Sequence, residues 1–137
     1  MKRTVQLQHD LPDGSSHVDW MLEWAGCQAG QLVSIRLETP LNTLEKGGYL
    51  LATRLKDHRA AYLEYEGPVS NDRGHVRRLE QGQILEWVCT GDEWWITLKW
   101  SGGPTHRVRV SGDGAAPEIG KACRVYASDQ SGSDSDR

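Results

Sequence analysis

Phenylalanine is absent from this sequence, although its 137 residues are enough to bury one hydrophobic core. The large apolar volume must therefore come from other side chains, and tryptophan, which occurs six times, is the main source. A buried indole needs a hydrogen-bond partner for its N–H group. We therefore expect polar groups inside the core beside some of the following residues: Trp20, Trp24, Trp87, Trp94, Trp95 and Trp100.

Cysteine is scarce and is not spaced for cross-linking or for metal binding. Cys27, Cys89 and Cys123 are odd in number and form no Cys-x-x-Cys pair. This pattern argues against a disulfide framework and against a structural zinc site. We expect a reduced intracellular protein whose three thiols pack as small apolar groups.

Long hydrophobic runs are absent too. No apolar signal core follows Met1, Lys2 and Arg3, and no run approaches the length of a membrane-spanning helix. We therefore expect a soluble, cytoplasmic protein that has no membrane partner. The net charge of −3 gives no global electrostatic case for nucleic-acid binding, so any such binding must depend on a local patch.

The chain also lacks an amphipathic helical stretch of convincing length. Short alternating segments separated by turn residues recur instead, which indicates an all-β barrel or sandwich. The predicted strands cover residues 4–9, 17–24, 32–38, 49–55, 61–66, 75–81, 83–89, 94–100, 107–111 and 121–127. We assign residues 1–127 to a single domain. Residues 128–137, which contain Ser, Asp and Gly but no apolar side chain, are predicted to be a disordered tail.

The stretch from residue 9 to residue 23 carries the clearest chemical pattern. From His17 onward the side chains alternate, so His17 and Asp19 project from the same face of a strand. His9 lies across a turn rich in Pro, Asp, Gly and Ser, within reach of both. Two imidazoles and one carboxylate suit Mn, Fe or Zn with open coordination positions. A surface histidine or a satisfied hydrogen-bonder is the competing explanation.

Three blocks of sequence also follow one another in a specific order. The first is Gln8-His9 and, after a turn, His17-Val18-Asp19-Trp20-Met21-Leu22-Glu23. The second runs through Thr53-Arg54-Leu55-Lys56-Asp57-His58 to Tyr62 and Gly67, and a weaker third runs from Gly74 to Gly82. Their order and spacing resemble the 3′-phosphoesterase domain found at the N-terminus of bacterial ATP-dependent DNA ligase D and in stand-alone proteins. The resemblance covers about residues 4–100.

The resemblance implies a fold and a set of roles. It implies a small single-domain β-barrel of roughly eight or more short, mostly antiparallel strands with little helix. In that family two His and one Asp bind a divalent metal, usually manganese, which implies His9, His17 and Asp19 as ligands. A later His and Tyr act at the phosphate, which implies His58 and Tyr62.

One departure from the family concerns the phosphate contact. The family has Arg two positions after the metal-binding Asp, whereas this chain has Met21 there. A thioether cannot replace a guanidinium fork. Arg36 and Arg54, which lie in strands flanking the site, are candidates for the missing contact, although a solvated strand face would equally explain Arg54.

Two further features could bear on nucleic acid. The basic cluster Arg73, Arg77 and Arg78 could follow a phosphate backbone, or it could be an exposed strand balanced by acidic neighbours. Trp94 and Trp95 are adjacent in a predicted strand and face opposite sides. At most one of them can offer a platform for a base, and the other belongs to the core.

These observations lead to one expected function and two alternatives. We expect a metal-dependent, and specifically manganese-dependent, phosphoesterase that removes a 3′-phosphate or 3′-ribonucleotide from DNA or RNA ends during repair. It would be a monomer, and any ligase or polymerase partner would act in trans. The first alternative, favoured by Met21, is a degenerate relative that binds metal and nucleic-acid ends or a protein without turnover. The second is a non-haem iron oxygenase using His17 and Asp19 with His75 or His106.

Overall fold

The computed structural model describes residues 2–24 and 30–128. In this part of the chain nine strands and two short 3₁₀ turns follow one another. The strands are β1 (Lys2–Asp10), β2 (Ser16–Leu22), β3 (Gln31–Leu37), β4 (Tyr49–Arg59), β5 (Gly67–Pro68), β6 (His75–Thr90), β7 (Glu93–Trp100), β8 (Thr105–Ser111) and β9 (Ala122–Ala127). The 3₁₀ turns are η1 (Leu41–Thr43) and η2 (Ala60–Leu63).

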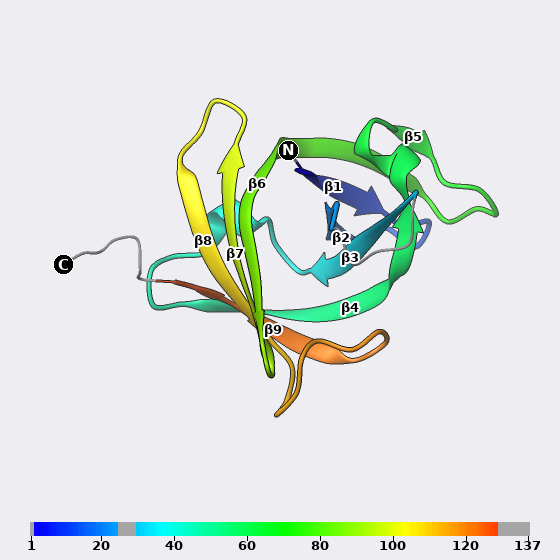
Figure 1. Ribbon diagram of the computed structural model, residues 1–137. Helices are drawn as coiled ribbons and strands as arrows, with labels where there is room; N and C mark the ends of the chain where they lie inside the picture. The colour runs from blue at the N-terminus through cyan, green and yellow to red at the C-terminus, as the bar shows by residue number, and fades with distance from the viewer. Residues whose placement is uncertain (1, 25–29, 129–137) are drawn as a thin grey trace.

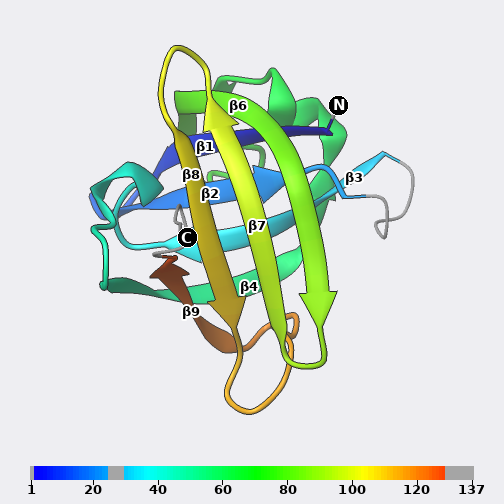
Figure 2. The same cartoon turned by 60° about the vertical axis from the view of Figure 1, so that its left-hand side comes forward.

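Eight of these strands close into an antiparallel barrel, which confirms the predicted fold class. The strand order is β1-β2-β3-β4-β9-β8-β7-β6, and the long β6 returns to pair with β1, while β5 adds to the start of β6. The barrel has two layers, in which β6, β7 and β8 cross over β1 to β4 (Figures 1 and 2). Closure leaves the eight barrel strands without a free edge, apart from the ends of the longer ones.

Two local predictions were wrong. Residues 61–66 do not form a strand, because η2 turns the chain there so that Leu63 is buried against β1. The predicted strands 75–81 and 83–89 are one continuous strand, β6. Gly82 lies in the middle of β6, where it allows close contact with β7 and does not end the strand. The predicted tail lies outside the described residues, except for Ser128. Cys27 also lies outside them.

The strands β1, β2 and β3 are buried on both faces, which gives the protein two apolar layers. Val18, Trp20 and Leu22 of β2 point into the barrel and belong to the main core. Met21 points the other way and packs in a second cluster on the outer side of the wall. The other buried members of that cluster are Val5, Leu7, Leu32, Leu63, Val69 and Val76.

The apolar side chains of β1 face the outer layer, and its polar side chains face the barrel interior. Val5 and Leu7 lie in the outer layer, whereas Thr4 and Gln6 are fully buried on the barrel side. The Trp20 indole donates to Thr4 Oγ1 at 3.0 Å, and Gln6 Oε1 accepts from the Leu41 backbone N–H at 2.6 Å. Thr4 therefore satisfies the Trp20 indole, as predicted, whereas the buried indole N–H of Trp100 has no partner among the described residues.

Replacing Gly82 tests the close packing of β6 on β7. The added methyl group of Gly82→Ala would lie 2.4 Å from the Lys99 carbonyl oxygen and 2.9 Å from Trp100 Cα. We expect a loss of about 1–3 kcal/mol in the free energy of unfolding, measured by urea denaturation. Gly91→Ala is the matched control, because nothing lies within 4 Å of its added methyl group. Equal effects of the two substitutions would contradict the packing argument.

Candidate metal centre and anion pocket

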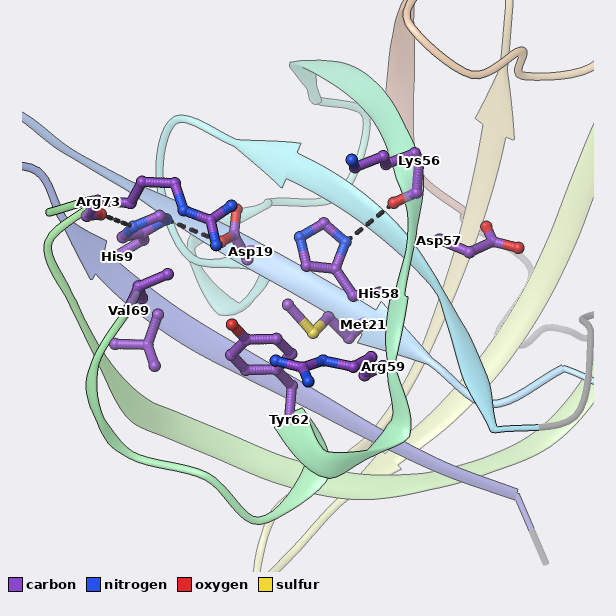
Figure 3. A pocket seen from close by; sticks show the side chains of 11 residues that line it. His9, Asp19, Met21, Lys56, Asp57, His58, Arg59, Tyr62, Val69 and Arg73 are labelled. Atoms are coloured by element: carbon purple, nitrogen blue, oxygen red, sulfur yellow. Dashed lines mark hydrogen bonds and ion pairs between the residues drawn. The ribbon is translucent and has the colours of Figure 1, made fainter. Parts of the chain in front are cut away.

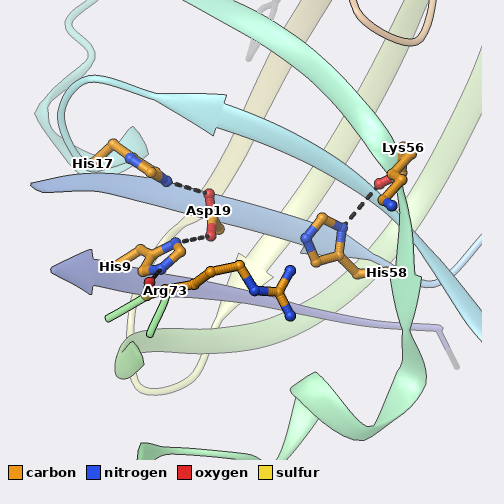
Figure 4. Close-up of polar contacts among 6 residues, drawn as sticks. All are labelled: His9, His17, Asp19, Lys56, His58 and Arg73. Carbon is orange, nitrogen blue, oxygen red and sulfur yellow. Dashed lines mark hydrogen bonds and ion pairs between the residues drawn. The ribbon is translucent and has the colours of Figure 1, made fainter. Parts of the chain in front are cut away.

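The register of β1 against β2 brings the three predicted ligands together. His9 pairs directly with His17 across the hairpin, and Asp19 follows two residues later on the same face of β2. One ligand atom from each residue can be chosen so that all three lie within 4.8 Å of one another. The two imidazole rings meet edge to face with their centroids 4.9 Å apart. The residues thus form a group of two imidazoles and one carboxylate (Figure 4).

The polar atoms of this group are incompletely satisfied by the protein. His9 Nδ1 lies 3.2 Å from Asp19 Oδ2 in a hydrogen bond. His17 Nε2 lies 3.1 Å from Asp19 Oδ1, within ion-pair distance but without hydrogen-bond geometry. Both atoms are buried, and neither has a hydrogen-bond partner among the described residues. A buried nitrogen and a buried oxygen that face each other in this way are a donor set that suits a divalent cation. The chemistry of the site therefore fits a metal ion.

The electrostatics of the group favour the carboxylate form of Asp19. Burial by itself would raise the pKa of Asp19, but the contacts with His17 and then with His9 outweigh it and lower the pKa to about 2. The hydrogen bond that His9 donates to Asp19 in turn raises the pKa of His9 against the opposing effect of burial. Asp19 is therefore an anion at neutral pH, which is the state that a metal ligand requires.

A backbone carbonyl fixes the orientation of His9. His9 Nε2 lies 2.6 Å from the carbonyl oxygen of Arg73, so this nitrogen carries the proton that is donated to the carbonyl. The hydrogen bond to the Asp19 carboxylate also places a proton on Nδ1, so both ring nitrogens donate in the imidazolium form, and losing the Nδ1 proton would leave the lone pair that a metal ligand requires. Hydrogen bonds of this kind commonly orient metal-binding histidines.

The loop that supplies this carbonyl is held tightly on β1. Gly74 has φ +94°, and an added Cβ would lie 1.9 Å from the Asp10 carbonyl oxygen. The preceding Asn71 and Asp72 also have positive φ values, 61° and 54°. Non-glycine residues in this conformation are uncommon and are frequent at functional sites.

A β-bulge directs His58 toward the same site. In the pairing of β3 with β4, Ser34 is opposite Leu55 but Leu32 is opposite His58, so β4 contains one extra residue. The extra residue reverses the alternation, and His58 therefore faces the side that carries Asp19. Its Nδ1 donates to the Lys56 carbonyl oxygen at 2.9 Å, and the ring points toward the pocket (Figure 4).

The same bulge separates Arg54 from the site. Arg54 pairs with Ile35, whose side chain lies inside the barrel, so Arg54 faces inward. Its guanidinium lies 5.0 Å from the centre of the Trp94 ring, donates to the Pro117 carbonyl oxygen and contacts Asp57. Arg36, in contrast, pairs with Asp19 and lines the groove beside His9 and His58. Of the two arginines predicted for phosphate binding, the structure brings only Arg36 to the site.

The pocket beside the ligand group has a volume of about 290 Å³ (Figure 3). Tyr62 of η2 lies over one side of it, with its ring centroid 5.8 Å from that of His58. Met21 is 1% exposed and forms part of the floor. The remaining lining residues are His9, Asp19, Lys56, Asp57, His58, Arg59, Val69, Arg73 and Val76.

Arg73 is the residue at this site that sequence reasoning did not assign to it. Its Nε donates to the Ser70 carbonyl oxygen at 2.8 Å, and a terminal nitrogen contacts Ser70 Oγ at 3.1 Å. This anchored guanidinium lies between Asp19 and His58 in Figure 4. The sequence signal was the Asn71-Asp72 pair before Gly74, which is typical of a tight loop, but nothing in the spacing relates the loop to His9. With Lys56 and Arg36, Arg73 gives the pocket a cationic rim suited to an anion.

The other candidate residues lie elsewhere. His75 is exposed, and His106 is in β8, which does not pair with β1 or β2. Trp94 is buried in the main core, whereas Trp95 faces outward, as the alternation predicted. Arg78 contacts the Leu63 carbonyl oxygen, and Arg77 contacts Gln8.

Comparison with known proteins adds no relative. No protein-family model matches the chain, and no curated protein matches it. The resemblance to the 3′-phosphoesterase domain therefore depends on the quoted sequence blocks. Among residues 2–24 and 30–128, no helix is long and apolar enough to cross a membrane.

Metal binding can be measured directly by isothermal titration with Mn²⁺. We expect binding to one site, and we expect His9→Ala, His17→Ala and Asp19→Ala each to abolish measurable binding because each removes one ligand atom. His75→Ala and His106→Ala are matched controls that remove an imidazole elsewhere and should leave the affinity unchanged. Loss of binding in either control would indicate a different ligand set, as in the oxygenase alternative.

Gly74→Ala should weaken the same site from a distance. The added methyl group would displace the loop from Asp10 and move the Arg73 carbonyl away from His9. We expect the Mn²⁺ affinity to fall by about tenfold or more. Gly114→Ala controls for backbone strain, since Gly114 also has positive φ but its added methyl group meets nothing within 4 Å. An unchanged affinity in the folded Gly74→Ala protein would contradict a positioning role for the carbonyl.

Proposed function

We propose that the protein is a metal-dependent phosphoesterase that acts on the 3′ ends of DNA or RNA. The observation that carries the proposal is the ligand group of His9, His17 and Asp19 at one end of a pocket with a cationic rim. His58 and Tyr62 stand in the same pocket, which is the arrangement implied by the sequence resemblance. We propose manganese as the metal, and any ligase or polymerase partner would act in trans.

The proposed chemistry divides between the ion and the side chains. A divalent ion bound by the three ligands would polarise a phosphate oxygen and lower the pKa of a coordinated water. His58 is held by its Nδ1–H bond to Lys56, so its Nε2 is the atom that exchanges a proton with the leaving oxygen. Imidazole is suited to this task near neutral pH. The Tyr62 hydroxyl, which points into the pocket in Figure 3, would donate to a phosphate oxygen.

Arg73 offers a replacement for the guanidinium that Met21 does not supply. Ser70 holds one edge of the Arg73 guanidinium. The remaining N–H groups of Arg73 have no hydrogen-bond partner among the described residues, so they can bind a phosphate oxygen in the pocket. Arg36 lines the neighbouring groove together with Arg73 and would contact a second phosphate of a chain. The Met21 side chain itself packs in the outer apolar layer.

The assay uses a primer-template that ends in a 3′-ribonucleotide or a 3′-phosphate, with Mn²⁺ added. We expect metal-dependent trimming by the wild type and loss of trimming in His58→Ala, because removing a positioned acid or base typically costs about 10²–10⁴-fold in rate.

Arg73→Lys should lower kcat/KM by about tenfold, since an ammonium cannot form the same two-pronged contact. Its Mn²⁺ affinity should stay unchanged, because the carbonyl that orients His9 belongs to the backbone.

Arg54→Lys is the matched control for Arg73→Lys and should retain full activity, since Arg54 faces the barrel interior. No trimming by the wild type, with Mn²⁺ bound at the three ligands, would favour the alternative of a binding protein without turnover. Oxygen consumption with Fe²⁺ in place of Mn²⁺ would favour the oxygenase alternative. Activity that survives His58→Ala would remove His58 from the mechanism.

A further inference from the structure

A second cationic surface lies on the outer side of the barrel, away from the pocket. Four neighbouring strands, β7, β8, β9 and β4, present one residue each to a single row. The strand register fixes this row, because Trp95 pairs with Arg109, Arg109 with Tyr126 and Tyr126 with Tyr49. Adjacent strands are about 4.8 Å apart, so the row is about 14 Å long. We call this surface the arginine–aromatic face.

Each aromatic ring of the row is in contact with a guanidinium. The Arg109 guanidinium lies 4.0 Å from the centre of the Tyr126 ring and 5.7 Å from that of Trp95. Arg124, which is next to the row, lies 5.2 Å from the Tyr49 ring, and Arg107 lies 6.0 Å from the Trp95 ring. These contacts hold the rings in place before any ligand binds, which lowers the entropic cost of binding.

The face has unpaired cations and exposed apolar surface. Glu93 forms an ion pair with Arg109, but neither Arg107 nor Arg124 has an ion pair in the part of the chain that the structure describes. Tyr49 is 52% exposed, and its neighbour on the same face, Leu51, is 53% exposed. The hollow that Arg124 and Tyr126 line also contains Asp113.

The alternation of rings and guanidinium groups is complementary to one class of polymer. A cation–π contact uses the face of a guanidinium and leaves its terminal N–H groups able to donate to phosphate oxygens, although Nε of Arg107 is itself buried. Exposed rings such as Tyr49 accept bases by stacking, without regard to sequence. A single strand of nucleic acid offers phosphates and unpaired bases together, whereas the bases of a duplex are stacked on one another.

Strand β4 connects this face with the pocket. Tyr49, Leu51 and Thr53 share the outer side of β4, and Thr53 pairs with Arg36 at the edge of the ligand group. His58 follows on the same side after the bulge. The distance along β4 from Tyr49 to His58 is about 30 Å. A single strand of nucleic acid lying along β4 would therefore run from the face toward the pocket.

We propose that the arginine–aromatic face binds single-stranded nucleic acid without sequence preference. Bases stack on Tyr49 and Tyr126, and phosphates contact Arg107 and Arg124. The proposal goes beyond the phosphoesterase proposal and does not depend on it, because the face contains none of the metal ligands and none of the pocket residues.

The test is fluorescence anisotropy of a labelled oligothymidylate with the full chain in EDTA, so that metal chemistry does not contribute. We expect binding that weakens steeply with salt. Arg124→Glu should weaken it by about tenfold, and Tyr49→Leu by about fivefold or more, whereas Tyr49→Phe keeps the ring and the affinity. Both side chains are exposed, so the variants should fold, which circular dichroism checks.

Two controls separate the face from general charge and from the pocket. Lys2→Glu makes the same charge change on another exposed residue and should leave the affinity unchanged. His58→Ala should also bind like the wild type in EDTA. Absence of oligothymidylate binding, or wild-type affinity in both Arg124→Glu and Tyr49→Leu, would overturn the proposal. Equal binding of polyglutamate, with no effect of Tyr49→Leu, would show a general polyanion or protein surface and would overturn it too.

Discussion

The hydrogen-bonded register of β1 against β2 holds the candidate centre together. It sets His9 opposite His17 and leaves Asp19 between the two rings. A slip of one residue would move every side chain of one strand to the other face, so the ligand group would be lost. The register is enforced on both sides of the wall, because Trp20 is fixed to Thr4 inside the barrel and Met21 packs on Val5 outside it.

The second apolar layer explains why a pocket exists at this wall of the barrel. Leu63 of η2 and Val69 of the following loop cover β1 and β2. Burying these side chains supplies the free energy that holds polar groups such as Tyr62 and the Arg73 carbonyl over the ligand group. A barrel wall that faced water on this side would expose Asp19 and leave it a surface carboxylate. The site is therefore a consequence of the way the segment after β4 folds back.

Positively charged side chains are concentrated at two separate sites of the molecule. The whole chain has a net charge of −3, yet cations gather at the pocket and again on the arginine–aromatic face. Coulombic attraction between exposed groups is screened beyond about 8–10 Å in physiological salt, so a ligand responds to these local groups and not to the total. Both sites offer guanidinium groups whose orientation is fixed by neighbours, Ser70 for Arg73 and a tyrosine ring for Arg124. A fixed fork loses less entropy when it binds a phosphate.

The sequence by itself determined the all-β class. It also determined that His17 and Asp19 lie on the same face of one strand, because alternation over a few residues is a local property of an extended chain. It also brought His9 within reach through the intervening turn. Tertiary structure decided the rest. His58 and Arg54 have the same parity in the sequence, but a bulge that exists only in the pairing of β3 with β4 sends them to opposite faces. Arg73 contacts His9 across 64 positions of the chain, through a loop whose approach depends on Gly74 and Asp10. Such contacts depend on packing between distant segments, for which a single sequence carries no periodic signal.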